Sequence, residues 1–413
     1  MKKRISVLAL ASVFAAGSAY AAGYAIPEQS VDSVAKAGAD IASANHADAA
    51  YFNPANMSWL DNAWMVEGDL DYIHLSSINY TDSRTSAYNG SSEQENFVPP
   101  TVFLVSPMYD NFRFGFSITE PYGLAKRWDD PYPATFSSKF ALEVFDYNPT
   151  VSYKINDMFS VSGGVRLLYS DATVSSSGVV GAYPGFGPIT ASRFVSGDAT
   201  GWGYNLAASA RPDKNSNISV TYRSEVDLDL SGNATMQTNF PPTTVSTNGS
   251  VTVVTPAVLA VSGAYTFWDK LTVDLTYDRT FWSEYKNLDF TYATQINGVL
   301  YNAFGVAIPK NWEDSNTYRI GLTYKATNSV TLMAGFAYDQ TPVPADTLGF
   351  ELPDSNAYLF SGGVRFQLTP QMDLGVALLY DMKSSRTVTN NQVSGTFTDA
   401  SALLGSVGLS YKF

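Results

Sequence analysis

The feature that most constrains this chain is an alternation of apolar and polar side chains with a period of two residues. Between residues 143 and 155 it places Phe145, Tyr147, Val151, Tyr153 and Ile155 opposite Asp146, Asn148, Thr150, Ser152 and Lys154. Successive side chains of a β-strand point to opposite faces, so the pattern predicts a strand with one apolar face. Residues 220–230 alternate as well, with Arg223, Asp227 and Asp229 on the polar side. Because such charged rows cannot face lipid or a dry core, we expect them to point into a wet interior.

About fourteen segments show this alternation, each roughly as long as the ten-residue tilted strand that crosses a bilayer. They are residues 62–74, 97–106, 111–119, 143–155, 159–171, 200–210, 217–231, 256–267, 271–282, 315–325, 330–339, 357–368, 371–381 and 402–413. An even number of strands returns both ends of a barrel to the same, periplasmic side. The sequence therefore predicts an all-β fold, a transmembrane antiparallel β-barrel of about 14 strands.

A secreted β-sandwich would also alternate, so other features must decide between the two folds. The apolar rows carry Tyr, Trp and Phe near strand ends, as in the aromatic girdles of outer-membrane barrels. The final row, Val407, Leu409, Tyr411 and Phe413, ends on a terminal aromatic residue, a pattern typical of such barrels. We therefore favour the barrel, and expect Phe413 to be recognised by the barrel assembly machinery of the outer membrane.

The N-terminus has the pattern of a secretory signal peptide. Lys2, Lys3 and Arg4 precede an apolar run at 5–16, and small residues follow up to the cleavage pattern Ala19-Tyr20-Ala21. The run is shorter than the ~20 residues of a membrane-spanning helix. We predict a signal peptide over residues 1–21 and a location in the outer membrane of a Gram-negative bacterium, in contact with its lipid and lipopolysaccharide.

Residues 22–58 break the alternation. They are crowded with alanine and contain the turn-forming sequence Asn53-Pro54-Ala55. Short helices that precede a barrel wide enough to have a lumen are most simply placed inside it. We predict a helical hatch over 22–58 that plugs a barrel over 59–413.

Composition excludes several classes of function. The chain of 413 residues has a formal charge of −13, which makes nucleic acid an improbable partner because phosphate binding needs a basic surface. It has no cysteine and two histidines, His46 and His74, so we predict no metal site and no cofactor. No nucleophile is marked with a base beside it, so we predict that the protein is not an enzyme.

The chain resembles the long-chain fatty acid transport protein (FadL) family of outer-membrane channels over nearly its whole mature length. The resemblance rests on a series of motifs in order: Ala22-Gly23-Tyr24; Asn53-Pro54-Ala55; Ser117-Ile118-Thr119 with Tyr122-Gly123-Leu124-Ala125; Gly201-Trp202-Gly203-Tyr204-Asn205; Ile218 with Thr221-Tyr222-Arg223-Ser224-Glu225-Val226; Tyr318-Arg319-Ile320; and Pro342-Val343-Pro344 with Pro353-Asp354. It implies a fourteen-stranded barrel with an N-terminal hatch. It also implies passive uptake of hydrophobic molecules, which bind in the barrel and leave sideways through a gap beside a kink in the third strand.

The resemblance also implies residues for gating and binding. The kink is expected near Gly115, Ser117 and Thr119, facing the turn Asn53-Pro54-Ala55. Tyr24 is the expected contact to the ligand. A fatty acid pocket needs a cation for the carboxylate, and the candidates are Arg166, which faces the lumen by its position in the alternation, and Lys310.

Three alternatives remain open. Met333 and Ala357 stand where the family resemblance suggests arginines, which would favour uncharged hydrocarbons, the substrates of the family's aromatic-hydrocarbon branch. A general diffusion porin, a different class of channel, would share strands and signal peptide but would lack the hatch. The polar stretches 80–96 and 232–255 are expected to be outer loops, which allow a secondary adhesive role. We expect the protein to be a monomer.

Overall fold

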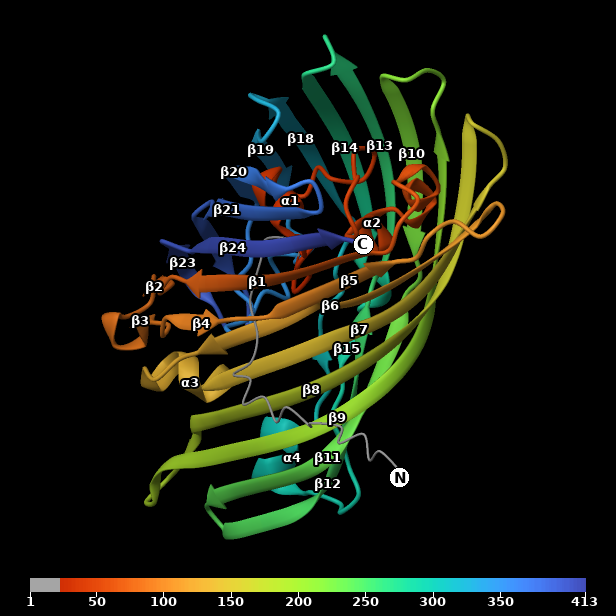
Figure 1. Cartoon of the computed structure of the whole chain (residues 1–413). Helices are drawn as coiled ribbons and strands as arrows, with labels where there is room; N and C mark the ends of the chain where they lie inside the picture. Colours follow the sequence, from red (N-terminus) through yellow and green to blue (C-terminus); the bar gives the residue numbers. More distant parts are fainter. Residues whose placement is uncertain (1–22) are drawn as a thin grey trace, which may run out of the picture.

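The computed structural model describes residues 23–413, so the predicted signal peptide lies outside the described residues. Its main feature is a closed, fourteen-stranded antiparallel β-barrel (Figure 1). The barrel closes where β1 pairs with β24 along its length, from Met65 opposite Lys412 to Leu75 opposite Ala402. The predicted fold class and strand number are confirmed.

The wall of the barrel consists of strands of unequal length in chain order. Three of the fourteen wall strands are each interrupted and consist of two consecutive shorter strands. The strands are β1 (Met65–Leu75), β4 (Glu95–Phe97) with β5 (Pro100–Val105), β6 (Phe112–Arg127), β7 (Lys139–Lys154), β8 (Phe159–Tyr183), β9 (Gly187–Ala210), β10 (Ser216–Arg223) with β11 (Val226–Asn239), β12 (Pro242–Thr255) with β13 (Ala257–Phe267), β14 (Leu271–Phe281), β18 (Ser315–Lys325), β19 (Val330–Asp339), β20 (Ala357–Thr369), β21 (Met372–Lys383) and β24 (Ser401–Lys412).

Residues 232–255 were expected to form an outer loop, but they are strands and not a loop. They belong to the hairpin β11–β12, which pairs from Val226 opposite Thr255 to Asn239 opposite Pro242. Strands β8 and β9 likewise extend beyond the predicted 159–171 and 200–210 and form a long hairpin at the same end of the barrel (Figure 1). Beyond the bilayer a strand needs no lipid-facing apolar row, so the alternation that predicted the other strands weakens here.

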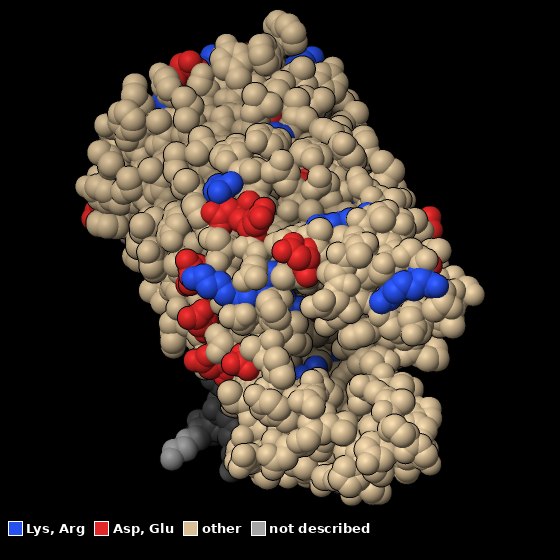
Figure 2. Space-filling view, turned by 180° about the vertical axis from the view of Figure 1, so that it is seen from behind, with Lys and Arg blue, Asp and Glu red and all other residues tan. Residues whose placement is uncertain are grey.

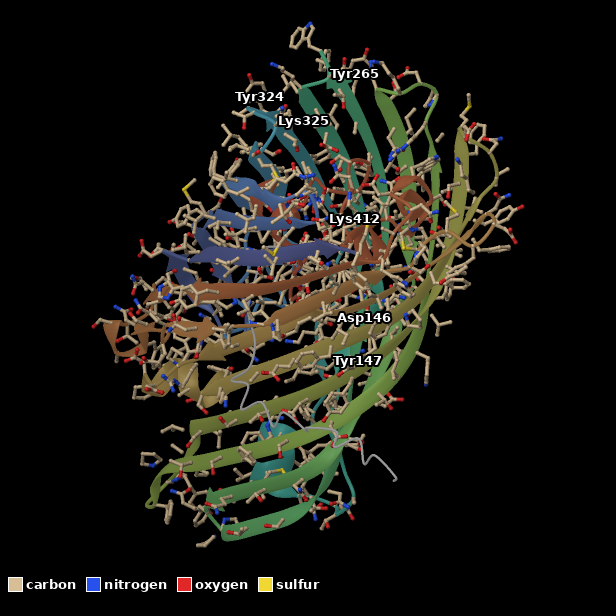
Figure 3. The ribbon with its side chains drawn as sticks, viewed as in Figure 1. Asp146, Tyr147, Tyr265, Tyr324, Lys325 and Lys412 are labelled. Carbon is tan, nitrogen blue, oxygen red and sulfur yellow. The ribbon has the colours of Figure 1, made fainter. Side chains whose placement is uncertain are left out.

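Side chains of the wall alternate between inside and outside, as predicted. On β7, Asp146 is fully buried, whereas the neighbouring Tyr147 points to the other face of the sheet (Figure 3). Tyr265 and Tyr324 are each 43% exposed. They lie near the rim of the barrel at which short turns connect the strands, called the short-turn end below, and Figure 3 places Lys325 at the same rim. On the face in Figure 2, charged side chains gather in a band across the middle and at the upper rim, leaving wide uncharged areas between. This distribution suits a wall that faces lipid.

The hatch region consists of short helices inside the barrel (Figure 1). They are α1 (Val31–Ala35), α2 (Ala49–Phe52) and the 3₁₀ helix η1 (Pro54–Trp59). Every residue of α1 and α2 is buried, and α1 packs against β19, β20, β21 and β24. The polar side chains that point inward from the wall therefore contact the hatch over much of their length. The sequence predicted a water-filled lumen there. Among residues 23–413, no helix is long and apolar enough to cross a membrane.

The remaining elements lie in the long connections between strands at the opposite end of the barrel from the short turns, called the long-loop end. They are β2 (Asn79–Asp82), η2 (Ser86–Tyr88), β3 (Gly90–Ser91), α3 (Pro131–Ser137), η3 (Trp282–Glu284), β15 (Asn287–Leu288), β16 (Thr291–Tyr292), α4 (Gly298–Phe304), β17 (Ile308–Pro309), β22 (Arg386–Thr389) and β23 (Ser394–Thr398). Strands β22, β23, β2 and β3 form a separate small sheet.

Candidate functional site

An aromatic cluster surrounds Tyr24. It consists of Tyr24, Tyr122, Trp282, Tyr285 and Trp312, all at least nine-tenths buried. The ring centroid of Tyr24 lies 4.8 Å from that of Trp282, 5.6 Å from Trp312 and 6.0 Å from Tyr285. The indole N–H groups of Trp282 and Trp312 find no hydrogen-bond acceptor among the described residues. The cluster therefore offers apolar surface together with two free donors.

A one-residue shift in strand pairing turns apolar side chains toward this cluster. Arg223 pairs with Asn205, but beyond the break between β10 and β11 Ser231 pairs with Asp198, one residue out of step. Such a bulge moves every later side chain to the opposite face. The prediction that Asp227 and Asp229 face the lumen is therefore wrong: both are exposed. Val226, Leu228 and Leu230 are buried instead and belong to the same apolar core as Tyr24.

The breaks in these strands also free carbonyl groups for the site. Pro256 separates β12 from β13 and has no N–H to contribute to a ladder. Its carbonyl accepts a hydrogen bond from the hydroxyl of Tyr122 at 3.2 Å, and the carbonyl of Val254 accepts one from Tyr24. At the neighbouring break the carbonyl of Ser224 accepts from Arg166 Nη1 at 3.0 Å. Irregular strands thus hold Tyr24, Tyr122 and Arg166 in place.

Two arginines and one aspartate lie beside Tyr122. Arg166 Nε donates to Asp146 Oδ2 at 2.8 Å, and Arg223 Nη1 lies 3.6 Å from the same oxygen. Arg223 also stacks on the ring of Tyr51 in α2, at 3.7 Å from its centroid. We call Arg166 and Arg223 the arginine pair. With Asp146 it carries one net positive charge, and Arg166 Nη2 and Arg223 Nη1 have no hydrogen-bond acceptor among residues 23–413.

The phenols of the cluster stay neutral. Burial raises the pKa of the Tyr24 hydroxyl well above its usual range, and burial also raises the pKa of Tyr285. Charged groups next to the cluster are the arginine pair and Asp146 at Tyr122, Glu225 at Tyr24, and Glu351 at Tyr285. A buried cation such as the arginine pair attracts an anion, because low-dielectric surroundings strengthen the interaction.

Lys310 belongs to a different group of residues. Its ammonium pairs with Glu351, and its backbone carbonyl accepts a hydrogen bond from the Thr347 hydroxyl at 2.5 Å. The sequence proposed Lys310 and Arg166 as alternative cations. Lys310 is neutralised by its own carboxylate, whereas Arg166 shares its carboxylate with a second arginine.

The hatch turn is fixed to the wall by side-chain amides. Asn53 Nδ2 donates to the carbonyl of Ile41 at 2.9 Å and to the hydroxyls of Ser209 and Ser219 at 3.0 and 2.9 Å. Pro54 begins η1, and the carbonyl of Ala55 accepts from the hydroxyl of Ser160 at 2.9 Å. The turn therefore contacts β8, β9 and β10 through its polar groups.

The third wall strand, β6, contacts the hatch at Met57 in η1, a few residues after the Asn53-Pro54-Ala55 turn. A Cβ at Gly115 would lie 2.6 Å from Met57 Sδ and from Thr150 Oγ1, and 3.0 Å from Ala50 Cβ, so a larger residue would force these side chains to shift. Ser117 and Thr119 are buried, and their hydroxyls have no partner among the described residues. The kink expected within 115–119 stays a prediction. Just beyond that stretch, the pairing of β6 with β7 shifts by one residue between Thr119 and Tyr122.

The wall is interrupted between β5 and β6. These strands pair only from Val102 opposite Ile118 to Val105 opposite Gly115. Extending that register would place Pro100, which has no N–H to donate, opposite Glu120, directly before Pro121. The freed edge of β6 bonds to the hatch instead: Ile26 N–H donates to the carbonyl of Pro121 at 2.8 Å, and Gly123 N–H donates to that of Tyr24 at 2.9 Å.

The structure also places the residues that raised the hydrocarbon alternative. Met333 and Ala357 are buried in an apolar cluster that α1 forms with β19–β21. Met333 further lines a cavity of about 1020 Å³ at the short-turn end, whose walls carry Lys36, Arg211 and Lys214. Neither residue belongs to the aromatic cluster.

Sequence reasoning missed Arg223, Trp282 and Trp312 as site residues. Arg223 could have been found, because the alternation places it on the polar, inward face of its strand. The tryptophans lie in loops, where no periodicity indicates the direction of a side chain.

A closed barrel whose lumen is filled by N-terminal helices, beside an apolar cluster and a break in the wall, defines an outer-membrane channel for hydrophobic molecules. A sequence profile of the family described as "Outer membrane protein transport protein (OMPP1/FadL/TodX)" matches residues 12–413. The chain belongs to this family, whose members are transporters, and the predicted resemblance and outer-membrane location are confirmed.

The relatives agree with this assignment. Outer membrane protein P1 of Haemophilus influenzae is 27% identical over 99% of both chains, and the long-chain fatty acid transport protein of Escherichia coli K12 is 26% identical over 91% of both. Among solved structures, a Pseudomonas aeruginosa FadL homologue superimposes with a TM-score of 0.81 at 23% identity, covering 95% of this chain and 100% of its own. The Pseudomonas putida toluene transporter TodX gives 0.73 at 19% identity, covering 93% and 98%. These structural matches support the fold.

Proposed function

We propose that this protein takes up long-chain fatty acids, binding the carboxylate at the arginine pair and the hydrocarbon chain within the aromatic cluster. The observation that carries the proposal is the buried net positive charge of Arg166, Arg223 and Asp146, with two guanidinium N–H groups unpartnered. A carboxylate would neutralise this charge and satisfy both donors. A neutral hydrocarbon would do neither.

The aromatic cluster supplies the apolar part of the binding. Burial of each CH₂ group contributes about 0.8 kcal/mol, so a long chain gains most of its affinity here. The cluster is filled by protein side chains, so a ligand must displace some of them. Tyr24 is the natural residue to move because it belongs to the N-terminal segment, which is held to β6 by a few backbone hydrogen bonds.

We further propose that the ligand leaves sideways, between β5 and β6. The prolines at 100 and 121 support this route, because neither offers an N–H to a ladder between β5 and β6. Movement of residues 24–26 away from β6 would uncover the gap. Lateral exit keeps the hydrocarbon chain out of water throughout, which avoids the cost of transferring it to an aqueous phase.

The decisive experiment is uptake in a host that lacks its own fatty acid channel, with labelled oleate and labelled toluene supplied separately. We expect oleate uptake that depends on this protein. Toluene uptake without oleate uptake would replace the proposal by the hydrocarbon alternative, which the aromatic lining of the cluster favours. Equal uptake of small hydrophilic solutes would indicate a porin.

The exit route has its own test. Replacing Pro100 and Pro121 with alanine restores one backbone donor on each of the edges that β5 and β6 turn toward each other, which allows the ladder to extend. We expect oleate binding to be retained and oleate uptake to fall toward that of cells without the protein. The matched control is Pro188→Ala, which lies in the outer hairpin. Uptake that remains normal in the double variant would contradict lateral release.

A further inference from the structure

Four carboxylates meet where the hatch contacts the wall, apart from the site described above. Asp32 lies in α1, Asp40 in the loop after it, Asp48 directly before α2, and Glu67 on β1. All four are at least nine-tenths buried. One oxygen from each of the three aspartates lies within 4.8 Å of the others, a spacing that can hold a metal ion.

Each carboxylate is held in place by one of its oxygens. Asp48 Oδ2 accepts from the Ser30 hydroxyl at 2.8 Å, Asp40 Oδ1 pairs with Lys36, and Asp32 Oδ1 pairs with Arg365. The hydroxyl of Ser43 donates to Asp40 Oδ1 as well, at 3.4 Å. Partners that fix one oxygen of a carboxylate orient the other, as the residues around metal ligands commonly do.

Several of the remaining oxygens are unpartnered. Asp40 Oδ2 and Asp48 Oδ1 have no hydrogen-bond donor among residues 23–413. The remaining oxygen of Asp32, Oδ2, lies 3.2 Å from His46 Nδ1.

Glu67 supplies independent support from the wall. Its Oε1 accepts from Arg365 Nη2 at 2.5 Å, and Arg365 Nε donates to Asp32. Nε and Nη2 lie along one edge of the guanidinium, so Glu67 and Asp32 lie side by side. Glu67 Oε2 is fully buried and has no donor among the described residues.

The charges of this group do not balance. Four carboxylates face two permanent cations, Lys36 and Arg365, and His46 lies beside Asp32. With His46 neutral, two negative charges remain in a buried place. Uncompensated buried charge is costly, and one divalent cation would neutralise it.

We propose that Asp32, Asp40 and Asp48 bind one divalent cation of the Ca²⁺ or Mg²⁺ type, which fastens the parts of the hatch to one another beside the barrel wall. Carboxylate oxygens without thiolates suit these hard cations, and Ca²⁺ accepts the irregular geometry that several carboxylates provide. The cation joins three parts of the hatch, and Arg365 connects Asp32 to Glu67 on β1. Its removal is expected to loosen the hatch.

The test uses the purified full-length protein in detergent, freed of metal with EDTA and dialysed against radioactive Ca²⁺. We expect one saturable Ca²⁺ per chain, competed by Mg²⁺, and a thermal unfolding temperature that rises with Ca²⁺. Asp48→Asn is expected to abolish binding, whereas Asp346→Asn, an exposed acid in an outer loop, leaves it unchanged. Ser30→Ala keeps all four carboxylates and is expected to weaken Ca²⁺ binding about tenfold or more.

Two results would overturn the proposal. The first is wild-type protein that binds no Ca²⁺ or Mg²⁺ saturably up to millimolar concentration, which would leave protonation as the means of balancing the charge. The second is binding that survives Asp48→Asn unchanged. If Asp48→Asn fails to fold, the wild-type titration and Ser30→Ala still decide the matter, since unchanged affinity in Ser30→Ala places the ion elsewhere.

Discussion

Removing Arg223 should separate recognition of charge from recognition of the hydrocarbon chain. Arg223→Met leaves Arg166 paired with Asp146 at 2.8 Å, so the site changes from one net positive charge to none. Arg166 is less suitable, because deleting one partner of a fully buried ion pair destabilises a protein by about 3–5 kcal/mol. Arg223 is only partly buried. Its loss removes the stacking on Tyr51, about 0.5–2 kcal/mol, and a hydrogen bond to the Tyr51 carbonyl, about 1.5–3 kcal/mol.

The expected effect on binding follows from the strength of one charged hydrogen bond. Such a bond contributes about 1.5–3 kcal/mol, and 1.4 kcal/mol corresponds to a factor of ten in affinity. Oleate should therefore bind about 10- to 100-fold more weakly to Arg223→Met. Oleyl alcohol, which has the same chain and no charge, should bind as it does to the wild type.

Calorimetric titration of both ligands into purified protein measures this difference. Arg211→Met is the matched control: Arg211 also stacks on an aromatic ring, Trp59 at 4.4 Å, but it lines the cavity at the short-turn end. It should change neither affinity. An equal loss of affinity for oleate and oleyl alcohol, or no loss for oleate, would refute the assignment of the carboxylate to the arginine pair.

Two further predictions concern the hatch. Gly115→Val should displace η1, because its Cβ would lie 2.6 Å from Met57 Sδ. The displaced hatch should increase the ion conductance of the protein in planar bilayers. The control Gly263→Val, where a Cβ meets nothing within 4 Å, should leave the conductance unchanged. A conductance equal to that of the wild type would show that the wall absorbs the added side chain. Asn53→Ala removes hydrogen bonds worth about 2 kcal/mol, so hydrogen exchange of residues 41–58 should accelerate about 30-fold, whereas the exposed Asn328→Ala leaves it unchanged. Exchange at the wild-type rate would mean that the amide does not hold the turn.

The sequence by itself determined the barrel, its strand number and the lumen-facing position of Arg166. These follow from the period-two alternation, which is a local property: a strand that faces lipid on one side must carry an apolar residue at every second position. The motifs along the chain similarly determined the family. The alternation carried no information about the long hairpins, since strands outside a bilayer need no apolar face.

Only the tertiary structure decided which residues meet. The pairing of Arg223 with Asp146 and the position of Pro100 opposite Glu120 both depend on strand register, which is a relation between distant parts of the chain. The bulge at the β10–β11 break reversed the inward face of the following strand and turned leucines, rather than aspartates, toward Tyr24. A shift of one residue exchanges the two faces of a strand, so the chemistry of the site follows from register as much as from residue type.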